Sequence, residues 1–77
     1  MKELIEQIAM KLVDYPEQVS VTEVEGENST VLELRVAKSD LGKVIGKEGS
    51  IAKAMRVLLG AATSHAQKKY TLEIVED

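Results

Sequence analysis

Apolar and charged side chains alternate in the middle of the chain, and this pattern constrains the fold more than any other. Leu32, Leu34 and Val36 would lie on one face of a strand, whereas Glu33 and Arg35 would lie on the other. Such alternation is typical of a sheet that has one face against a core and the other in water. The rest of the chain therefore has to cover a single face of this sheet.

The surrounding apolar patterns predict three helices and two more strands. Apolar residues recur at helical spacing from Leu4 to Val13, and this helix ends before Pro16 because the residue that precedes proline avoids the α region. The polar stretch 26–29 favours a hairpin turn. The predicted elements are a first helix that ends at Asp14, strands 18–25 and 30–37, a short helix 39–45, a long helix from Ser50 to about Gln67, and a last strand 70–75.

The apolar pattern is less regular in two of these elements. In the first strand, Val24 breaks the alternation of Val19 and Val21, which predicts a bulge or an early strand end. In the long helix, Gly60 either allows close packing against a neighbouring element or is simply tolerated at that position. The residues of this helix that are expected to face the core are Ile51, Ala54, Met55, Leu58 and Ala62.

The element order is α-β-β-α-α-β, which predicts an α+β fold. The first two strands would form an antiparallel hairpin, and the second would reach the third through two helices, so that pair can be parallel with a right-handed crossover. Three helices would then cover one face of a three-stranded mixed sheet. Ser39 and Ser50 are expected to be the N-caps of the second and third helices. With 77 residues, the chain is expected to be one domain, 1–77, with a thin core.

The composition argues against several classes of function. The chain has no cysteine and one histidine, His65, and no carboxylate cluster appears, so we expect neither a metal nor a cofactor. No apolar run approaches the ~18 residues of a membrane helix, and the first residues lack the apolar segment of a signal peptide, so we expect no membrane association and a cytoplasmic location. No nucleophile–base set and no Walker-type lysine accompany the glycines, which argues against an enzyme and against a small-molecule substrate.

The charge is unevenly distributed along the chain. The total is −3, but the segment from Lys38 to Arg56 holds five basic and two acidic residues, a net charge of +3, and the remainder carries −6. The local field governs attraction to a polyanion more than the total charge does. The segment is therefore compatible with nucleic-acid binding, although lysines that only solvate helix faces would give the same count.

Two glycines, Gly46 and Gly49, enclose a loop between the short and the long helix. Glycine lacks a Cβ atom and tolerates positive φ, so the backbone of such a loop can approach a sugar-phosphate chain closely. The helix that starts at Ser50 adds free N–H groups and a positive dipole end, which favour an anion. The same spacing also fits a simple corner between two helices with glycine as the C-cap.

The run Val44–Gly49, in this order of elements, resembles a KH domain of the second topological type along the whole chain. The length, the first helix and the ending are similar to those of the KhpA family of small single-domain bacterial KH proteins. The resemblance implies single-stranded RNA binding, in which the GxxG loop clamps the backbone of about four nucleotides. It also implies an RNA chaperone or post-transcriptional regulator, a homodimer or a heterodimer with a larger KH-containing protein, and a link to cell-wall biogenesis and cell shape.

The resemblance assigns roles to residues on and around the loop. One face of the strand 30–37 would form the wall opposite the loop. The expected RNA-binding residues are Gly46, Lys47, Glu48 and Gly49 in the clamp, Ser50 at the helix start, Ile45, Ile51 and Ala52 beneath the bases, and Lys43, Lys53 and Arg56 near phosphates.

Three features lower the expected affinity. Glu48 places a negative charge inside the clamp, and Ser50 stands where relatives often carry a basic residue. Tyr15 and Tyr70 are the only aromatic residues and neither is near the loop, so base stacking on rings, worth ~1–3 kcal/mol per base, is not expected. We therefore expect modest affinity, low sequence specificity and a dissociation constant that rises steeply with salt.

A second interpretation follows from the same features. The chain could be a protein-interaction adaptor or dimerisation module with little RNA binding of its own, because small cores often gain stability by oligomerising. The surface expected for such contacts is the face of the long helix that carries Val57, Gly60, Ala61 and Ser64.

Overall fold

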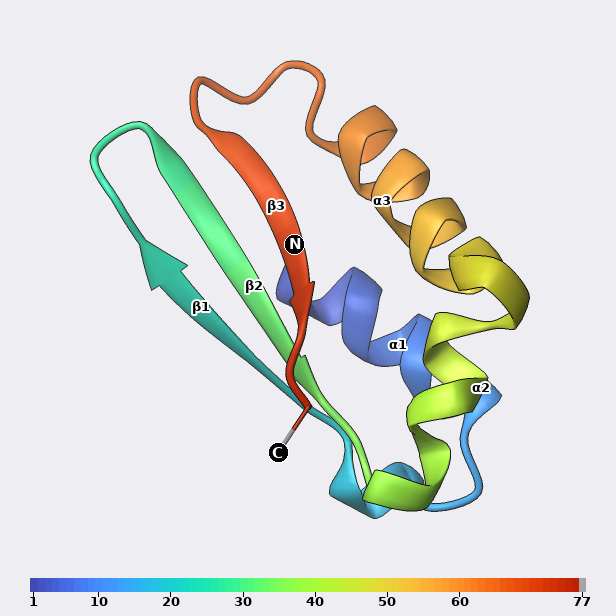
Figure 1. Cartoon of the computed structure of the whole chain (residues 1–77). Coiled ribbons are helices and arrows are strands. Elements are labelled where there is room, and N and C mark those ends of the chain that lie inside the picture. Colours follow the sequence, from blue (N-terminus) through green and yellow to red (C-terminus); the bar gives the residue numbers. More distant parts are fainter. Residues whose placement is uncertain (77) are drawn as a thin grey trace.

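The computed structural model describes residues 1–76 and confirms the α-β-β-α-α-β order (Figure 1). Single 3₁₀ turns lie at Pro16–Gln18, Lys38–Asp40 and Lys47–Gly49. The helices and strands are α1 (Lys2–Leu12), β1 (Ser20–Glu25), β2 (Ser29–Arg35), α2 (Leu41–Ile45), α3 (Ser50–Ala62) and β3 (Lys69–Ile74).

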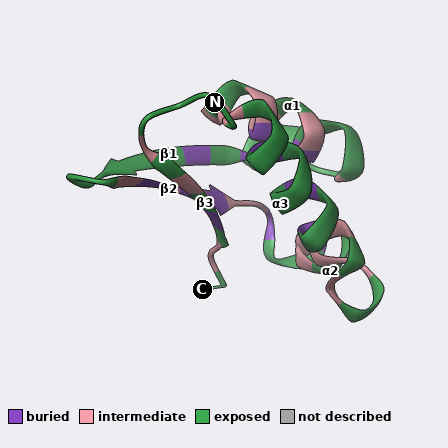
Figure 2. Ribbon diagram, turned by 90° about the horizontal axis from the view of Figure 1, so that it is seen from above, coloured by how far each residue is buried: buried purple, intermediate pink, exposed green. Residues whose placement is uncertain are grey.

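The three strands form one mixed sheet in the order β1-β2-β3. β1 pairs antiparallel with β2, with Val21 opposite Leu34, and β2 pairs parallel with β3, with Leu32 opposite Leu72. The parallel pair is connected through α2 and α3, as the element order predicts. The helices lie on one side of the sheet (Figures 1 and 2), so the other face is open.

The core lies between the sheet and the helices. Leu32 and Leu34 of β2 are fully buried, whereas Glu33 and Arg35 point to the open face and pair with each other at 3.5 Å. Complete burial of each leucine side chain contributes ~1.5–3 kcal/mol to folding. The other fully or nearly fully buried apolar residues, contributed by α1, α2 and α3, are Ile5, Ala9, Val44, Met55 and Leu59.

The predicted core face of α3 is confirmed for Ile51 and Met55 but wrong for the other three residues. The helix buries Ala52, Met55 and Leu59, whereas Leu58 is 51% exposed. Ala54 and Ala62, which were also expected to face the core, are exposed. α3 itself carries apolar side chains around most of its circumference, so the spacing of apolar residues alone could not identify the buried face.

The helix also ends earlier than predicted, at Ala62 rather than near Gln67. Thr63 leaves the helical region with φ −110° and ψ 13°, and its Oγ1 donates to the carbonyl of Leu59 at 2.8 Å. Gly60 is exposed, and a Cβ atom built on it would meet nothing within 4 Å. This glycine therefore does not serve close packing within the chain.

The predicted serine caps and the predicted irregularity of β1 are also wrong. Neither helix has a side-chain cap hydrogen bond: α2 starts after Asp40, and Gly49 occupies the N-cap position of α3. Ser39 lies inside a 3₁₀ turn, and Ser50 is the first residue of α3. The β1–β2 register runs without a bulge, and Val24 simply faces solvent, 47% exposed.

Candidate functional site

The loop between α2 and α3 has a backbone that requires glycine. Gly46 has φ 77° and ψ 174°, and a Cβ atom at this position would lie 2.8 Å from the backbone nitrogen of Ile51 and would collide with the Ile51 side chain. Gly49 has φ 78° and ψ 14°, and Glu48 between them adopts φ 57° and ψ 25°. Positive φ at three of four positions turns the chain sharply at the start of α3.

This backbone leaves two amides of the loop open. The Gly46 amide donates to the carbonyl of Gly42 at 2.9 Å, and the Gly49 amide donates to the carbonyl of Gly46 at 3.2 Å. The Ser50 amide donates to the carbonyl of Lys47. Lys47 and Glu48 are the first two residues of the 3₁₀ turn Lys47–Gly49, and the amides at the start of a helical turn have no acceptor inside that turn. Among the backbone hydrogen bonds that residues 1–76 make outside helices and strands, none has either amide as its donor, and both residues are exposed. Two adjacent free N–H groups beside a helix start form a site that suits an anion.

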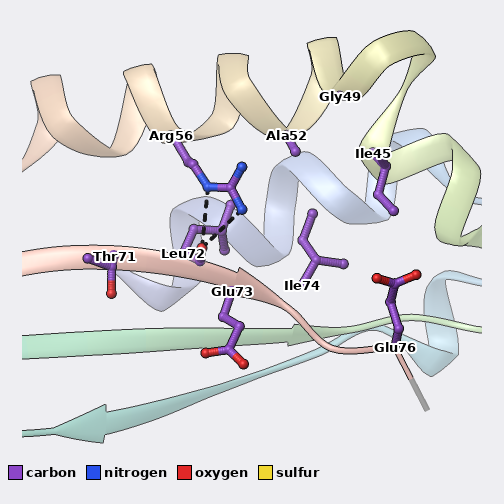
Figure 3. A pocket seen from close by; sticks show the side chains of 9 residues that line it. All are labelled: Ile45, Gly49, Ala52, Arg56, Thr71, Leu72, Glu73, Ile74 and Glu76. Atoms are coloured by element: carbon purple, nitrogen blue, oxygen red, sulfur yellow. Dashed lines mark hydrogen bonds between the residues drawn. The ribbon is translucent and has the colours of Figure 1, made fainter.

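A groove of about 480 Å³ extends from this loop between α3 and the edge strand β3 (Figure 3). Its residues are Ile45, Gly49, Ala52, Arg56, Thr71, Leu72, Glu73, Ile74 and Glu76. The prediction that β2 forms the opposite wall is therefore wrong. β2 is the central strand with a partner on each edge, so β3 is the strand that borders α3.

Two of the three predicted floor residues line the groove. Ile45 and Ala52 point into it, and Ile74 of β3 faces them from the other wall (Figure 3). Ile51 is not among the lining residues, because its side chain packs beneath Gly46 and supports the loop. The floor is therefore aliphatic, and neither tyrosine contributes to it.

Arg56 crosses the groove from α3 to β3. Its Nε and Nη2 donate to the carbonyl of Leu72 at 3.4 and 3.3 Å (Figure 3). The backbone groups of successive strand residues point alternately to the two edges of the strand. The amides of Lys69 and Val75 donate to Asn28 and Leu34, on the side of β2, so the carbonyl of Leu72 lies on the free edge of β3. The remaining N–H groups of the guanidinium stay available to a ligand in the groove.

The three predicted lysines differ in their surroundings. Lys47 is exposed in the loop, and the side chain of Lys53 passes Gly49, with its Cε 3.8 Å from the position of a Cβ there. Lys43 instead points toward the segment after α1, with its Nζ 3.0 Å from Asp14 and 3.7 Å from Asp40. The hydrogen bond that the Lys43 ammonium donates to the Asp14 carboxylate raises the pKa of Lys43 above its usual value. Lys47 and Lys53 therefore lie in or beside the loop, Arg56 lies further along the groove at Leu72, and Lys43 is held in a separate ion pair.

Asp40 supports the position of α2 through contacts that the sequence pattern did not reveal. Its side chain is fully buried, and its two carboxylate oxygens accept hydrogen bonds from the amides of Asp14 and Tyr15 at 3.1 and 3.0 Å. The carboxylate thereby ties the segment after α1 to the start of α2, which carries the loop. An aspartate before a helix is so common that its sequence position gave no signal of this long-range contact.

Two negative findings apply to residues 1–76. No helix there has the length and apolar character needed to cross a membrane. In the same residues, no group of three or more histidine or acidic side chains is arranged to hold a metal ion.

Comparison with known proteins agrees with the fold. A sequence model of the KhpA/KhpB KH domain matches residues 2–74. A protein of Clostridium perfringens named RNA-binding protein KhpA is 56% identical over 75 residues, which cover 97% of this chain and 100% of the relative. Its namesake in Clostridium acetobutylicum is 53% identical with the same coverage. A third, from Chlamydia trachomatis, is 49% identical over 77 residues, which cover 100% of this chain and 99% of the relative.

No solved structure matched the chain. The family match and the full-length relatives rest on sequence, and the observed α-β-β-α-α-β topology with its mixed sheet is that of a type II KH domain. Sequence and architecture thus agree, and the chain belongs to the KhpA/KhpB KH-domain family.

Proposed function

We propose that this protein binds single-stranded RNA and that the loop Gly46–Gly49 clamps the sugar-phosphate backbone. The observation that carries the proposal is the pair of free amides at Lys47 and Glu48, which can donate to one phosphate. The names of the relatives, each an RNA-binding protein, support the same ligand.

The groove suggests how a strand would lie. Phosphates would follow the loop and the start of α3, where Lys47 and Lys53 add positive charge. Bases would then face the aliphatic floor of Ile45, Ala52 and Ile74 (Figure 3). Without aromatic rings in the groove, backbone and aliphatic contacts have to supply the affinity, so binding should be modest and salt-dependent.

Replacing Lys47 and Glu48 together by aspartate tests the clamp. Two carboxylates beside the free amides would repel a phosphate, so we expect binding to a short single-stranded RNA to weaken roughly tenfold or more. The slope of log Kd against log salt should also fall by about one, because one phosphate contact is lost. Fluorescence anisotropy over a salt series measures both quantities, and circular dichroism checks the fold.

Lys11→Asp is the matched control, because it changes the net charge by the same amount at an exposed residue of α1. We expect it to change affinity far less than the double variant does. A folded double variant that binds like the parent would contradict the clamp and favour the adaptor interpretation.

We extend the proposal to the cellular role and the partner. Family membership supports an RNA chaperone or post-transcriptional regulator that acts in the cytoplasm and is linked to cell-wall biogenesis and cell shape. The exposed face of α3 supports self-association: Val57 is 71% exposed, and Gly60 beside it leaves open space. We propose that a second copy of the chain covers this face, with a larger KH-containing protein as the alternative partner.

Val57→Asp tests this interface. A carboxylate in an apolar contact is costly to desolvate, so we expect a dimer to become monomeric in sedimentation-velocity measurements. Met10→Asp makes the same kind of change at an exposed site on α1 and should leave the dimer intact. A parent protein that sediments as a monomer at high concentration would rule out the homodimer.

A further inference from the structure

Glu76 places an unpaired carboxylate at the loop end of the groove. It follows β3, and its side chain points between Ile45 and Ile74 on the side that faces α3 (Figure 3). Within residues 1–76, no ion pair and no hydrogen bond engages this carboxylate. An acidic group therefore lies where an anionic ligand is expected, and the phosphates of that ligand would avoid it.

The neighbouring acidic residue of the strand is oriented differently. Glu73 contributes to the groove lining, but its carboxylate points to the opposite side of β3, over the open face of the sheet (Figure 3). This follows from strand alternation, since Leu72 and Ile74 face the helices. Of the acidic residues in 1–76 that line the groove, Glu76 alone therefore presents its carboxylate to it, and Glu73 offers an internal comparison on the same segment.

The two ends of the groove differ in hydrogen-bonding character. Arg56, at the Leu72 end, has only donors, and Glu76, at the Ile45 end, has only acceptors when ionised (Figure 3). If phosphates follow the loop and α3, then Glu76 meets the edge of a base rather than the backbone. A carboxylate accepts readily from the N4 amino group of cytosine. Uracil presents the acceptor O4 at the same position and has its donor, N3–H, one atom further along the base edge, so a carboxylate aligned with the 4-position favours cytosine over uracil.

We propose that Glu76 makes this groove favour bases with an exocyclic amino group over uracil. The inference rests on the proposed RNA binding and goes beyond it by naming the class of base. The carboxylate is exposed and hydrated, so the selection is limited: one hydrogen bond in such a setting corresponds to about three- to tenfold in affinity.

Short oligo(C) and oligo(U) strands of equal length test the proposal. The two bases have the same ring size, so shape and apolar contact are matched, and the difference lies in the hydrogen-bonding edge. We expect the parent protein to bind oligo(C) about three- to tenfold more tightly than oligo(U) in fluorescence anisotropy. In Glu76→Gln the side-chain amide can donate to O4 as well as accept, so the ratio should fall toward one, mainly because oligo(U) binds better.

Glu73→Gln is the matched control. It removes the same charge from the same segment, so the affinity for both strands should rise as much as in Glu76→Gln wherever net charge is the cause. The ratio of oligo(C) to oligo(U) affinity, however, should stay at the parent value. Equal affinities for the two strands in the parent, or a ratio that Glu76→Gln leaves unchanged, would overturn base selection while RNA binding stands. If neither strand binds at low salt, RNA binding itself fails and the inference fails with it.

Discussion

Gly46→Ala should lower the melting temperature by roughly 10–20 °C and weaken RNA binding by about tenfold or more. The backbone at Gly46, with φ 77° and ψ 174°, lies in a region that is essentially restricted to glycine. The added Cβ would also lie 2.8 Å from the backbone nitrogen of Ile51, which sits in the first turn of α3 and cannot yield without moving the helix. Together these effects cost ~2–3 kcal/mol of folding free energy.

The effect on binding follows from the same distortion. To accept a Cβ atom, the loop has to rotate, which would move the amides of Lys47 and Glu48 out of the positions in which we propose that they bind a phosphate. Thermal unfolding by circular dichroism gives the stability change, and anisotropy measured well below the melting temperature gives the binding change.

The second glycine of the loop serves as the comparison. Gly49 also has positive φ, but a Cβ there would meet only the flexible Cε of Lys53, at 3.8 Å. Gly49→Ala should therefore cost only ~1 kcal/mol, the usual penalty for an alanine in the left-handed region. If the two variants unfold at the same temperature, the close approach of Gly46 to Ile51 does not govern the loop.

The sequence pattern predicted the architecture because each strand carries its own signal. Alternation in β2 identified the buried face, and Leu32 and Leu34 are indeed fully buried. The pattern failed where one element offers two apolar faces. Along α3, Leu58 and Leu59 are equally apolar, and only the approach of the sheet decides that Leu59 is buried and Leu58 is exposed.

The site was predictable to the extent that it is local. The GxxG spacing predicted a sharp glycine-dependent loop, and the basic residues Lys47 and Lys53 do lie beside it. The contacts that depend on distant segments were not predictable. Whether Lys43 faces RNA or Asp14, and which strand borders α3, are decided by the tertiary arrangement rather than by spacing along the chain.

Asp40→Ala is expected to destabilise the fold by ~3 kcal/mol, which corresponds to a melting temperature lower by roughly 10–20 °C. Its buried carboxylate accepts from the amides of Asp14 and Tyr15, 26 and 25 residues earlier in the chain. Alanine would leave both N–H groups without an acceptor and would remove one partner of Lys43. Unfolding in urea, with equal slopes for parent and variant, measures the loss.

Asp14→Ala separates this effect from the ion pair. The Asp14 side chain is 67% exposed and contacts Lys43 at 3.0 Å, so its removal should cost no more than ~0.5 kcal/mol, as for other surface pairs. A large loss from Asp40→Ala beside a small loss from Asp14→Ala would show that hydrogen bonds to the main chain, rather than charge pairing, hold α2 and its loop against the segment after α1. Similar losses in the two variants would instead assign that role to Lys43, and the loop would then depend on an exposed salt bridge that added salt weakens.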